Sequence, residues 1–313
     1  MVSKQSMNKV LLTGSRGMVG KNILEDNNSK DYFFLNPSRD ELDLLNSQHI
    51  NEYLKKNKPD IIIHAAGVVG GIAANIKYPV KFLHDNALMG LNIINSSLVN
   101  DIPKFINIAS SCMYPKTAPN PLKEEMILNG VLEPTNEGYA LAKILTCKLC
   151  EYISNSHSNK FYKTVIPCNL YGKHDNYLEN SSHMIPAVIN KIYKAMLKND
   201  EVEIWGDGKA RREFMSASSL ADFIFYALEN FEKMPQTLNV GLGHDYSILE
   251  YYIAISEVIG YKTNFKYDFS KPIGMQQKLV DIKKLENFGW TNKTNLKEGV
   301  QEAYLHYKEN YGI

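Results

Sequence analysis

Short apolar runs alternate with longer helical patterns through the first half of the chain. The runs lie at residues 9–13, 32–35, 60–64, 104–109 and 163–168. Several are almost continuous in Val, Ile and Leu, which is typical of strands buried on both faces of a parallel sheet. Helical patterns occupy residues 51–57, 79–99 and 136–155. Strands that alternate with helices at this spacing predict an α/β fold with a doubly wound parallel sheet.

The pattern becomes less regular after residue 168. A helix is predicted at about 184–197 and a strand at 201–205. These elements predict a smaller mixed α/β domain, which is expected to cover the ligand that binds at the parallel sheet. We expect a first domain of residues 7–168 with a returning segment at about 210–240, and a substrate-binding domain of residues 169–209 and 241–313.

Composition excludes several classes of partner. The chain has 313 residues, with 44% hydrophobic and 22% charged residues and a net charge of +1. A nearly neutral chain gives no electrostatic reason to expect nucleic acid or an anionic membrane surface. No apolar run approaches the roughly 20 residues of a membrane helix, and no N-terminal stretch resembles a signal peptide. We therefore expect a cytoplasmic enzyme.

The four cysteines are expected to be reduced thiols, as in other cytoplasmic proteins. Cys147 and Cys150 form a C-x-x-C pair. This pair lies inside a helical pattern, and no second pair completes a zinc site. We expect no metal centre.

A glycine-rich segment, GSRGMVG at 14–20, follows the first predicted strand. Its first glycine permits a tight turn, its second lets a pyrophosphate approach the backbone, and its third lets the helix pack against the strand. The helix N-terminus then offers unpaired N–H groups to phosphates. The segment predicts a dinucleotide-binding Rossmann sheet. The residues expected at the cofactor are Gly14, Arg16, Gly17, Met18, Val19 and Gly20.

The end of the second strand indicates which dinucleotide binds. NAD sites usually carry an acidic residue there, but this chain reads LNPSR at 35–39. Arg39 and Arg16 can face a 2′-phosphate with forked donors, which favours NADP(H) over NAD. The alternative is that both arginines are solvated surface residues.

Other residues near the sheet edge have weaker signals. Asp43 is expected to contact adenine, and the small Ala65 and Ala66 would let the backbone lie close to the cofactor. His64, at the end of the third strand, is expected to be a hydrogen-bonded structural residue and not a catalyst.

Tyr139 and Lys143 are the candidate catalytic pair. They lie four residues apart in GYALAK, on one face of a predicted helix. The ammonium is expected to lower the pKa of the phenol from its usual value of about 10, so that it exchanges a proton at neutral pH. Ser110, Ser111 and Cys112 follow a strand at the sheet edge where ligands bind. A serine hydroxyl there can donate to a substrate carbonyl oxygen beside Tyr139.

Nine motifs occur in order along about residues 8–290. They are GSRGMVG (14–20), SRDELDLL (38–45), VGGI (69–72), SSCMYP (110–115), EPTNEGYALAKI (133–144), CNLYGKHDN (168–176), SHMIPAVI (182–189), WGDGKARREF (205–214) and SKPIGMQQKLVD (270–281). Together they resemble the GDP-L-fucose synthase family of the extended short-chain dehydrogenase/reductase superfamily.

The resemblance implies an NADPH-dependent reductase of the C4 ketone of a GDP-4-keto-6-deoxy sugar, with prior 3,5-epimerisation. Ser110 or Ser111, Tyr139 and Lys143 match the reductase residues, and Lys143 would also bond the nicotinamide ribose. Cys112 and His183 match the epimerisation acid/base pair. A thiol and an imidazole, with ordinary pKa values of about 8.5 and 6.5, can exchange protons near neutrality.

The resemblance also implies a substrate site and an assembly. The residues that would line the GDP-sugar site are Asn169, Lys191, Trp205, Arg212 and Lys278. Trp205 would lie near guanine, and the cations near the diphosphate. The expected assembly is a homodimer through the helices near 79–99 and 136–155.

Two alternatives remain open. Residues 215–219 (MSASS), Lys191 and Gln277 depart from the family pattern on the sugar-nucleotide side. A C4 reductase without epimerisation, acting on a related sugar such as a GDP-6-deoxy-4-keto-heptose, would keep the same framework. A non-catalytic NADP-sensing protein is disfavoured, because it has no need of Tyr139, Lys143 and a serine together.

Overall fold

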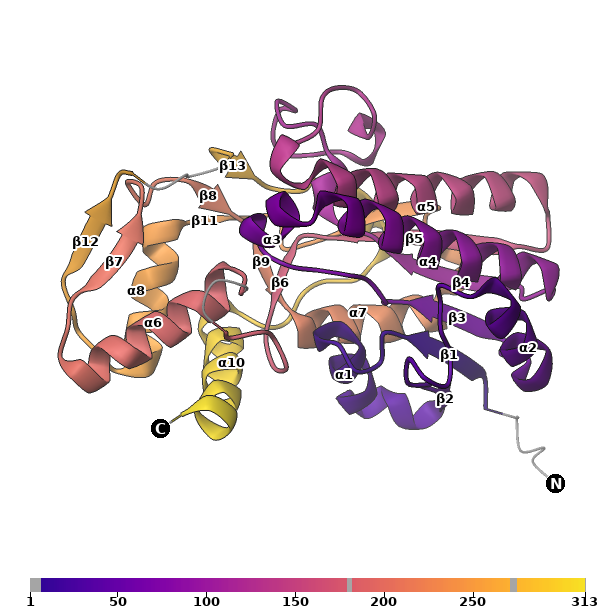
Figure 1. Ribbon diagram of the computed structural model, residues 1–313, viewed down its shortest axis with the longest axis horizontal. Coiled ribbons are helices and arrows are strands. Elements are labelled where there is room, and N and C mark those ends of the chain that lie inside the picture. The colour runs from indigo at the N-terminus through magenta and orange to yellow at the C-terminus, as the bar shows by residue number, and fades with distance from the viewer. Residues whose placement is uncertain (1–6, 179–181, 271–274, 313) are drawn as a thin grey trace.

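A six-stranded parallel sheet organises the computed structural model, which describes residues 7–178, 182–270 and 275–312 (Figure 1). The strand order is β10-β5-β4-β3-β1-β2, and every neighbouring pair is parallel. The strands are β1 (Lys9–Thr13), β2 (Phe33–Leu35), β3 (Ile61–His64), β4 (Lys104–Ile108), β5 (Phe161–Pro167) and β10 (Thr237–Val240). The predicted doubly wound parallel sheet is confirmed.

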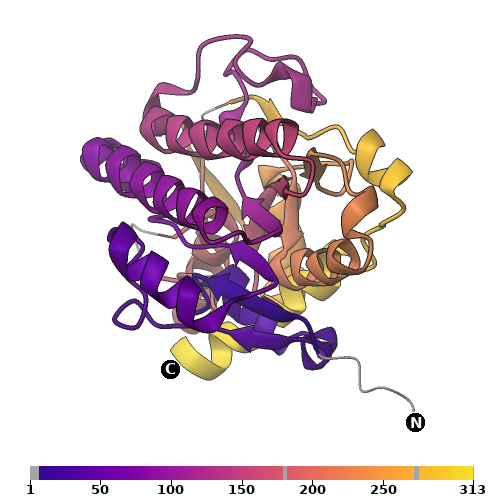
Figure 2. The same ribbon diagram turned by 90° about the vertical axis from the view of Figure 1, so that its right-hand side faces the viewer.

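Helices cover both faces of this sheet (Figure 2). One layer holds α2 (Ser47–Asn57), α4 (Pro79–Val99) and α5 (Glu137–Ser156), and the other holds α1 (Met18–Glu25) and α7 (Ala217–Glu229). The predicted helix at 79–99 is confirmed at both ends, with proline in its first turn, where the missing N–H costs nothing. Helix α1 begins at Met18, because the turn closed by the Gly17 N–H and the Gly14 carbonyl oxygen (3.0 Å) leads directly into it.

Helices α4 and α5 pack unusually closely where Gly90 faces Thr146. A Cβ at position 90 would lie 2.2 Å from Thr146 Cγ2, so only glycine fits. The Thr146 hydroxyl is itself fixed, since it donates to the Lys143 carbonyl oxygen at 3.0 Å. The position of α5, which carries Tyr139 and Lys143, is therefore set by this contact.

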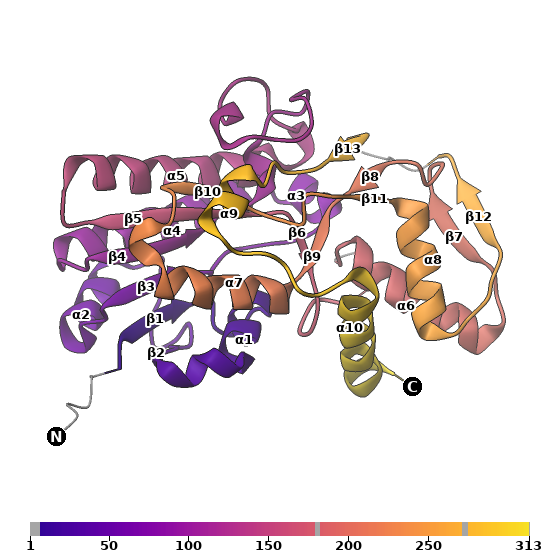
Figure 3. The same cartoon turned by 180° about the vertical axis from the view of Figure 1, so that it is seen from behind.

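A second apolar core lies at the end of the molecule away from β2 (Figures 1 and 3). It is formed by α6 (Met184–Lys198), α8 (Ile248–Ile259), α10 (Leu296–Tyr311) and the strand pair β7 (Val202–Trp205) and β12 (Phe265–Asp268). The predicted helix at 184–197 and strand at 201–205 correspond to α6 and β7.

Short elements join the two cores. They are the pair β6 (Asn169–Tyr171) and β9 (Phe214–Ser216) and the small sheet β11 (Tyr246–Ser247), β8 (Arg211–Arg212) and β13 (Gln277–Lys278). Two short helices pack on the main-sheet half, α3 (Ile72–Lys77) against α4 and α9 (Lys283–Phe288) against β10. Five 3₁₀ turns complete the described chain: η1 (Asn27–Asp31), η2 (Ser111–Met113), η3 (Glu124–Met126), η4 (Pro134–Asn136) and η5 (Phe231–Lys233). The expected division into two domains stays a prediction. Among the described residues, the structure has no helix that is long and apolar enough to cross a membrane.

Candidate active site

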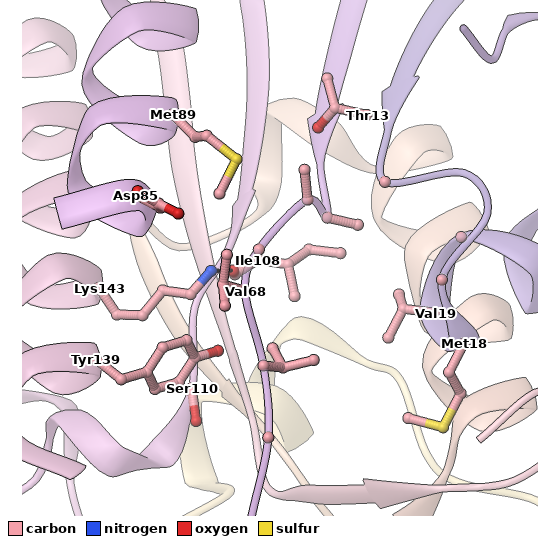
Figure 4. Close-up of a pocket in the computed structure, with 18 of the residues that line it drawn as sticks. Thr13, Met18, Val19, Val68, Asp85, Met89, Ile108, Ser110, Tyr139 and Lys143 are labelled. Carbon is pink, nitrogen blue, oxygen red and sulfur yellow. Dashed lines mark hydrogen bonds between the residues drawn. The ribbon is translucent and has the colours of Figure 1, made fainter. Parts of the chain in front are cut away.

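A cavity of about 640 Å³ opens at the carboxyl ends of the central strands. The loop at 14–20 forms one wall, and Ser110, Tyr139 and Lys143 form the facing wall (Figure 4). The lining also includes Arg16, Arg39, Asp43, Ala65, Ala66, Asn169 and His183. The structure therefore brings together all the predicted cofactor residues and most of the predicted catalytic ones.

The glycine loop forms a cradle that fits a dinucleotide. Gly14 has a φ of 73°, and a Cβ there would lie 2.6 Å from the Ala66 backbone nitrogen. Helix α1 starts at Met18, and no side chain caps it at Gly17. The first residues of α1, Met18 to Gly20, line the cavity, so the N-terminal end of the helix dipole favours a phosphate there.

Arg16, Arg39 and Asp43, the residues predicted at the adenosine of the cofactor, all line the cavity. Glu41, which the sequence analysis passed over, accepts a 2.7 Å hydrogen bond from the Ser38 backbone N–H. The hydrogen bonds from Ser38, together with the charge of Arg16, lower the pKa of Glu41. The Glu41 carboxylate thus stabilises a local turn, and Arg16 and Arg39 both line the cavity.

Ser110, Tyr139 and Lys143 come from two adjacent elements. Ser110 follows β4 and caps η2, where its hydroxyl accepts from the Cys112 N–H at 3.4 Å. Lys143 Nζ donates to the Ile108 carbonyl oxygen at 2.9 Å and lies 5.7 Å from the centre of the Tyr139 ring. Ser111 is buried and lies outside the cavity lining, whereas Ser110 lines the cavity beside Tyr139 in the same wall.

The expected lowering of the Tyr139 pKa is wrong for this structure. Burial raises the pKa of Tyr139, and the nearby Cys112 raises it further. Burial also lowers the pKa of Lys143, to about 8. The helical spacing does bring the two side chains together, but desolvation of the phenolate decides the direction of the shift. At neutral pH Tyr139 is therefore a neutral phenol, the form that donates a proton.

His64 has the structural role expected of it. Its Nδ1 shares a 2.8 Å hydrogen bond with the Thr13 hydroxyl. Burial, helped by the charge of Lys143, lowers the pKa of His64 to about 3, so the imidazole stays neutral.

The two predicted epimerisation residues are not placed alike. His183 precedes α6 and lines the cavity, and desolvation lowers its pKa. Cys112 is buried in η2 outside the lining, and burial raises its pKa although Lys278 and Lys143 oppose the shift. Cys168, which the sequence analysis did not select, does line the cavity at the end of β5. The position of Cys168 at the carboxyl end of a strand is the same signal that identified Ser110, and it could have identified Cys168 as well.

The predicted substrate residues form two groups beyond Asn169. Arg212 and Lys278 are paired neighbours in β8 and β13. Lys191 Nζ lies 5.8 Å from the Trp205 ring centre and donates to the Glu203 carbonyl oxygen at 2.7 Å. These four residues lie outside the lining of the cavity. Within the described ranges, no cluster of His, Cys, Asp and Glu can hold a metal ion.

Comparisons with known proteins agree with this architecture. Residues 10–241 match the NAD dependent epimerase/dehydratase family. The chain is 59% identical over 306 residues to a GDP-L-colitose synthase from Yersinia pseudotuberculosis, covering 96% of this chain and 99% of that protein. It is 47% identical to a GDP-L-fucose synthase from Azorhizobium caulinodans, covering 96% of each.

A solved structure supports the same assignment. A GDP-mannoheptose C4 reductase from Campylobacter jejuni with NADP bound superposes with a TM-score of 0.88 at 29% identity, covering 97% of this chain and 99% of that one. The chain therefore belongs to the NAD dependent epimerase/dehydratase family, in the part of that family that includes the GDP-L-fucose synthases.

Proposed function

We propose that the protein is an NADPH-dependent reductase of the C4 ketone of a GDP-4-keto-6-deoxy sugar. The observation that carries this proposal is the cavity wall of Ser110, Tyr139 and Lys143 opposite a dinucleotide-binding loop. The two relatives, a GDP-L-colitose synthase and a GDP-L-fucose synthase, support a GDP-sugar as the substrate.

The cofactor site suits NADP(H). Arg16 and Arg39 line the end of the cavity where a 2′-phosphate would lie, and the relative of known structure holds NADP. Asp43, Ala65 and Ala66 line the same wall. When bound, the cofactor supplies the hydride that reduces the ketone carbon.

The protein's own groups handle the proton. The neutral phenol of Tyr139 gives its proton to the C4 oxygen, while the Ser110 hydroxyl donates a hydrogen bond to the same oxygen. Lys143 then stabilises the tyrosinate that forms and orients the nicotinamide ribose. Burial raises the pKa of Tyr139, which keeps the proton in place until the oxygen gains charge.

Epimerisation before reduction distinguishes the two candidate reactions. Both relatives at 47% and 59% identity are named for L-sugars, which favours inversion of the sugar ring by His183 and Cys112. The second candidate is reduction without epimerisation. It is favoured by the burial of Cys112 behind the cavity lining and by the name of the C4 reductase from C. jejuni.

One experiment tests the function and separates the candidates. The protein is incubated with NADPH and candidate GDP-4-keto sugars, NADPH oxidation is followed by absorbance, and the product is analysed by NMR. We expect NADPH oxidation with a GDP-4-keto-6-deoxy sugar and a reduced C4. Inverted configuration at C3 or C5 would assign the first candidate, retained configuration the second, and absence of oxidation with every sugar would refute the reductase.

We further propose a cytoplasmic homodimer in which α4 and α5 form the interface. Val80, Leu83, Leu141, Leu145 and Tyr152 of these helices are exposed apolar or aromatic side chains. Exposed apolar side chains gathered on two packed helices favour contact with a second chain.

A further inference from the structure

Two cations lie side by side in the small sheet between the two cores. Arg212 of β8 and Lys278 of β13 are register partners, so their side chains leave the same face of the sheet. Burial lowers the pKa of both, and the charge of Arg212 lowers the pKa of Lys278 further. Two desolvated like charges repel each other, so the surrounding groups must hold this pair together, and the charge of Asp245 offsets part of the effect of burial on Arg212.

Glu213, the next residue in the chain, holds the surrounding backbone. Its carboxylate is almost fully buried, with the residue 1% exposed. One oxygen accepts from the Leu242 and Gly243 N–H groups at 2.5 and 2.9 Å. The other accepts from the Val280 N–H at 2.9 Å, two residues after Lys278. The carboxylate thus ties the segment after Lys278 to the loop after β10.

The backbone of Glu213 completes the connection. Its N–H donates to the Lys278 carbonyl oxygen at 3.2 Å, and its carbonyl oxygen accepts from the Asn169 side chain at 2.9 Å. Asn169 lines the cavity. Glu213 therefore links both cation-bearing strands to the wall of the active site.

A second carboxylate fixes the preceding register pair. Asp245 accepts from Arg211 Nε at 2.6 Å and from Gln277 Nε2 at 2.6 Å. Arg211 and Gln277 are partners one step before Arg212 and Lys278, and their side chains leave the opposite face. Asp245 therefore holds β8 and β13 together one register step before the cation pair, on the opposite face of the sheet. Glu213 holds the chain after the pair.

We propose that Glu213 is a positioning residue for the substrate diphosphate, acting through the Arg212–Lys278 pair. This inference rests on the proposed function, since it takes the anion to be the diphosphate of a GDP-sugar. Two cations on register partners of neighbouring strands suit the two negative phosphates of a nucleoside diphosphate, and each contact would be a charge-assisted hydrogen bond. Glu213 itself touches no substrate.

The test compares how GDP and guanosine bind to the protein saturated with NADP. Isothermal titration calorimetry gives the dissociation constant of each, and their ratio measures what the diphosphate contributes. Glu213→Gln keeps the size of the side chain but replaces one acceptor oxygen with a donor that faces a backbone N–H group. We expect GDP to bind about tenfold more weakly, as for loss of one hydrogen bond to a charged group, with guanosine affinity unchanged.

Glu124→Gln is the matched control. Glu124 is also a buried carboxylate, and it accepts from the Asn239 backbone N–H at 2.9 Å on the main sheet. This variant should bind both ligands as the unmodified protein does. If Glu213→Gln does not fold, Glu213→Asp, which retracts the charge by one methylene, is measured with the same expectation.

Two results would overturn the positioning role while leaving the reductase intact. One is a GDP affinity in the Glu213 variant within about twofold of the unmodified protein. The other is a parallel loss of GDP and guanosine affinity, which a general structural defect produces. If the unmodified protein binds no GDP, the proposed function itself fails and the inference fails with it.

Discussion

Lys143 gives the sharpest test of the electrostatics of the site. Replacing it with methionine keeps the length of the side chain and removes its charge. In the folded protein the ammonium is buried, and its pKa falls from the usual 10.5 to about 8. At a pH between about 8 and 10.5, Lys143 is deprotonated in the folded protein but still protonated in the unfolded chain. Stability of the unmodified protein therefore rises with pH in this window, because the unfolded state binds more protons.

The size of the effect follows from the shift. One pH unit across the window contributes about 1.4 kcal/mol, so raising the pH from 7 to 10 should stabilise the unmodified protein by about 2 to 3 kcal/mol relative to Lys143→Met. The same titration predicts that kcat/KM of the unmodified enzyme falls as pH rises above about 8, since neutral Lys143 cannot stabilise a tyrosinate.

Urea denaturation at pH 7 and pH 10 measures this difference for both proteins. Lys148→Met is the control in the same helix, because Lys148 pairs with Glu151 at 2.9 Å near the surface, which raises its pKa. Lys148→Met keeps Lys143, so the stability of the unmodified protein relative to this variant should not increase between pH 7 and pH 10. An equal stability difference between the unmodified protein and Lys143→Met at both pH values would refute the depressed pKa.

The remaining predictions concern single steps of the proposed reaction. Tyr139→Phe should lower kcat by about 10² to 10⁴-fold without changing NADPH affinity measured by fluorescence titration; undiminished turnover would remove Tyr139 from the mechanism. Cys112→Ser should suppress solvent deuterium uptake at C3 and C5, and uptake equal to that of the unmodified enzyme would exclude Cys112 as the epimerisation base. Arg39→Ala should raise the KM for NADPH about tenfold or more while leaving that for NADH nearly unchanged, and equal effects would contradict the 2′-phosphate contact. Leu145→Glu should give a monomer by light scattering, whereas an unchanged mass would move the interface elsewhere.

The sequence predicts the main sheet well because its strands are short, continuous apolar runs. Residues 60–64, for example, contain three consecutive isoleucines, and β3 occupies Ile61–His64. Helix α4 was predicted at both ends, since Pro79 marks its first turn. The joining sheet was not predicted, because β8, β11 and β13 have two residues each and no period can be read from two residues.

The cofactor residues predicted from the sequence all line the cavity, but Ser111, Cys112 and four of the predicted substrate residues do not, and the energetics of the site were not predicted. The spacing of Tyr139 and Lys143 indicates that the two side chains are neighbours, but not how strongly burial opposes their charges. Glu213 gave no signal, because a carboxylate next to two arginines is typical of a solvated surface. Its burial depends on loops that are distant in the sequence, at Leu242 and Val280.

The close contact between Gly90 and Thr146 has a consequence for attempts to change what this enzyme accepts. Any side chain at position 90 would push α5 outward, and Lys143 lies one turn before Thr146 on that helix. Libraries that aim at a new sugar can therefore vary the joining sheet, where the side chains are far from this contact. A methyl group at position 90, which is not itself in the cavity lining, would shift the proton donor away from its target.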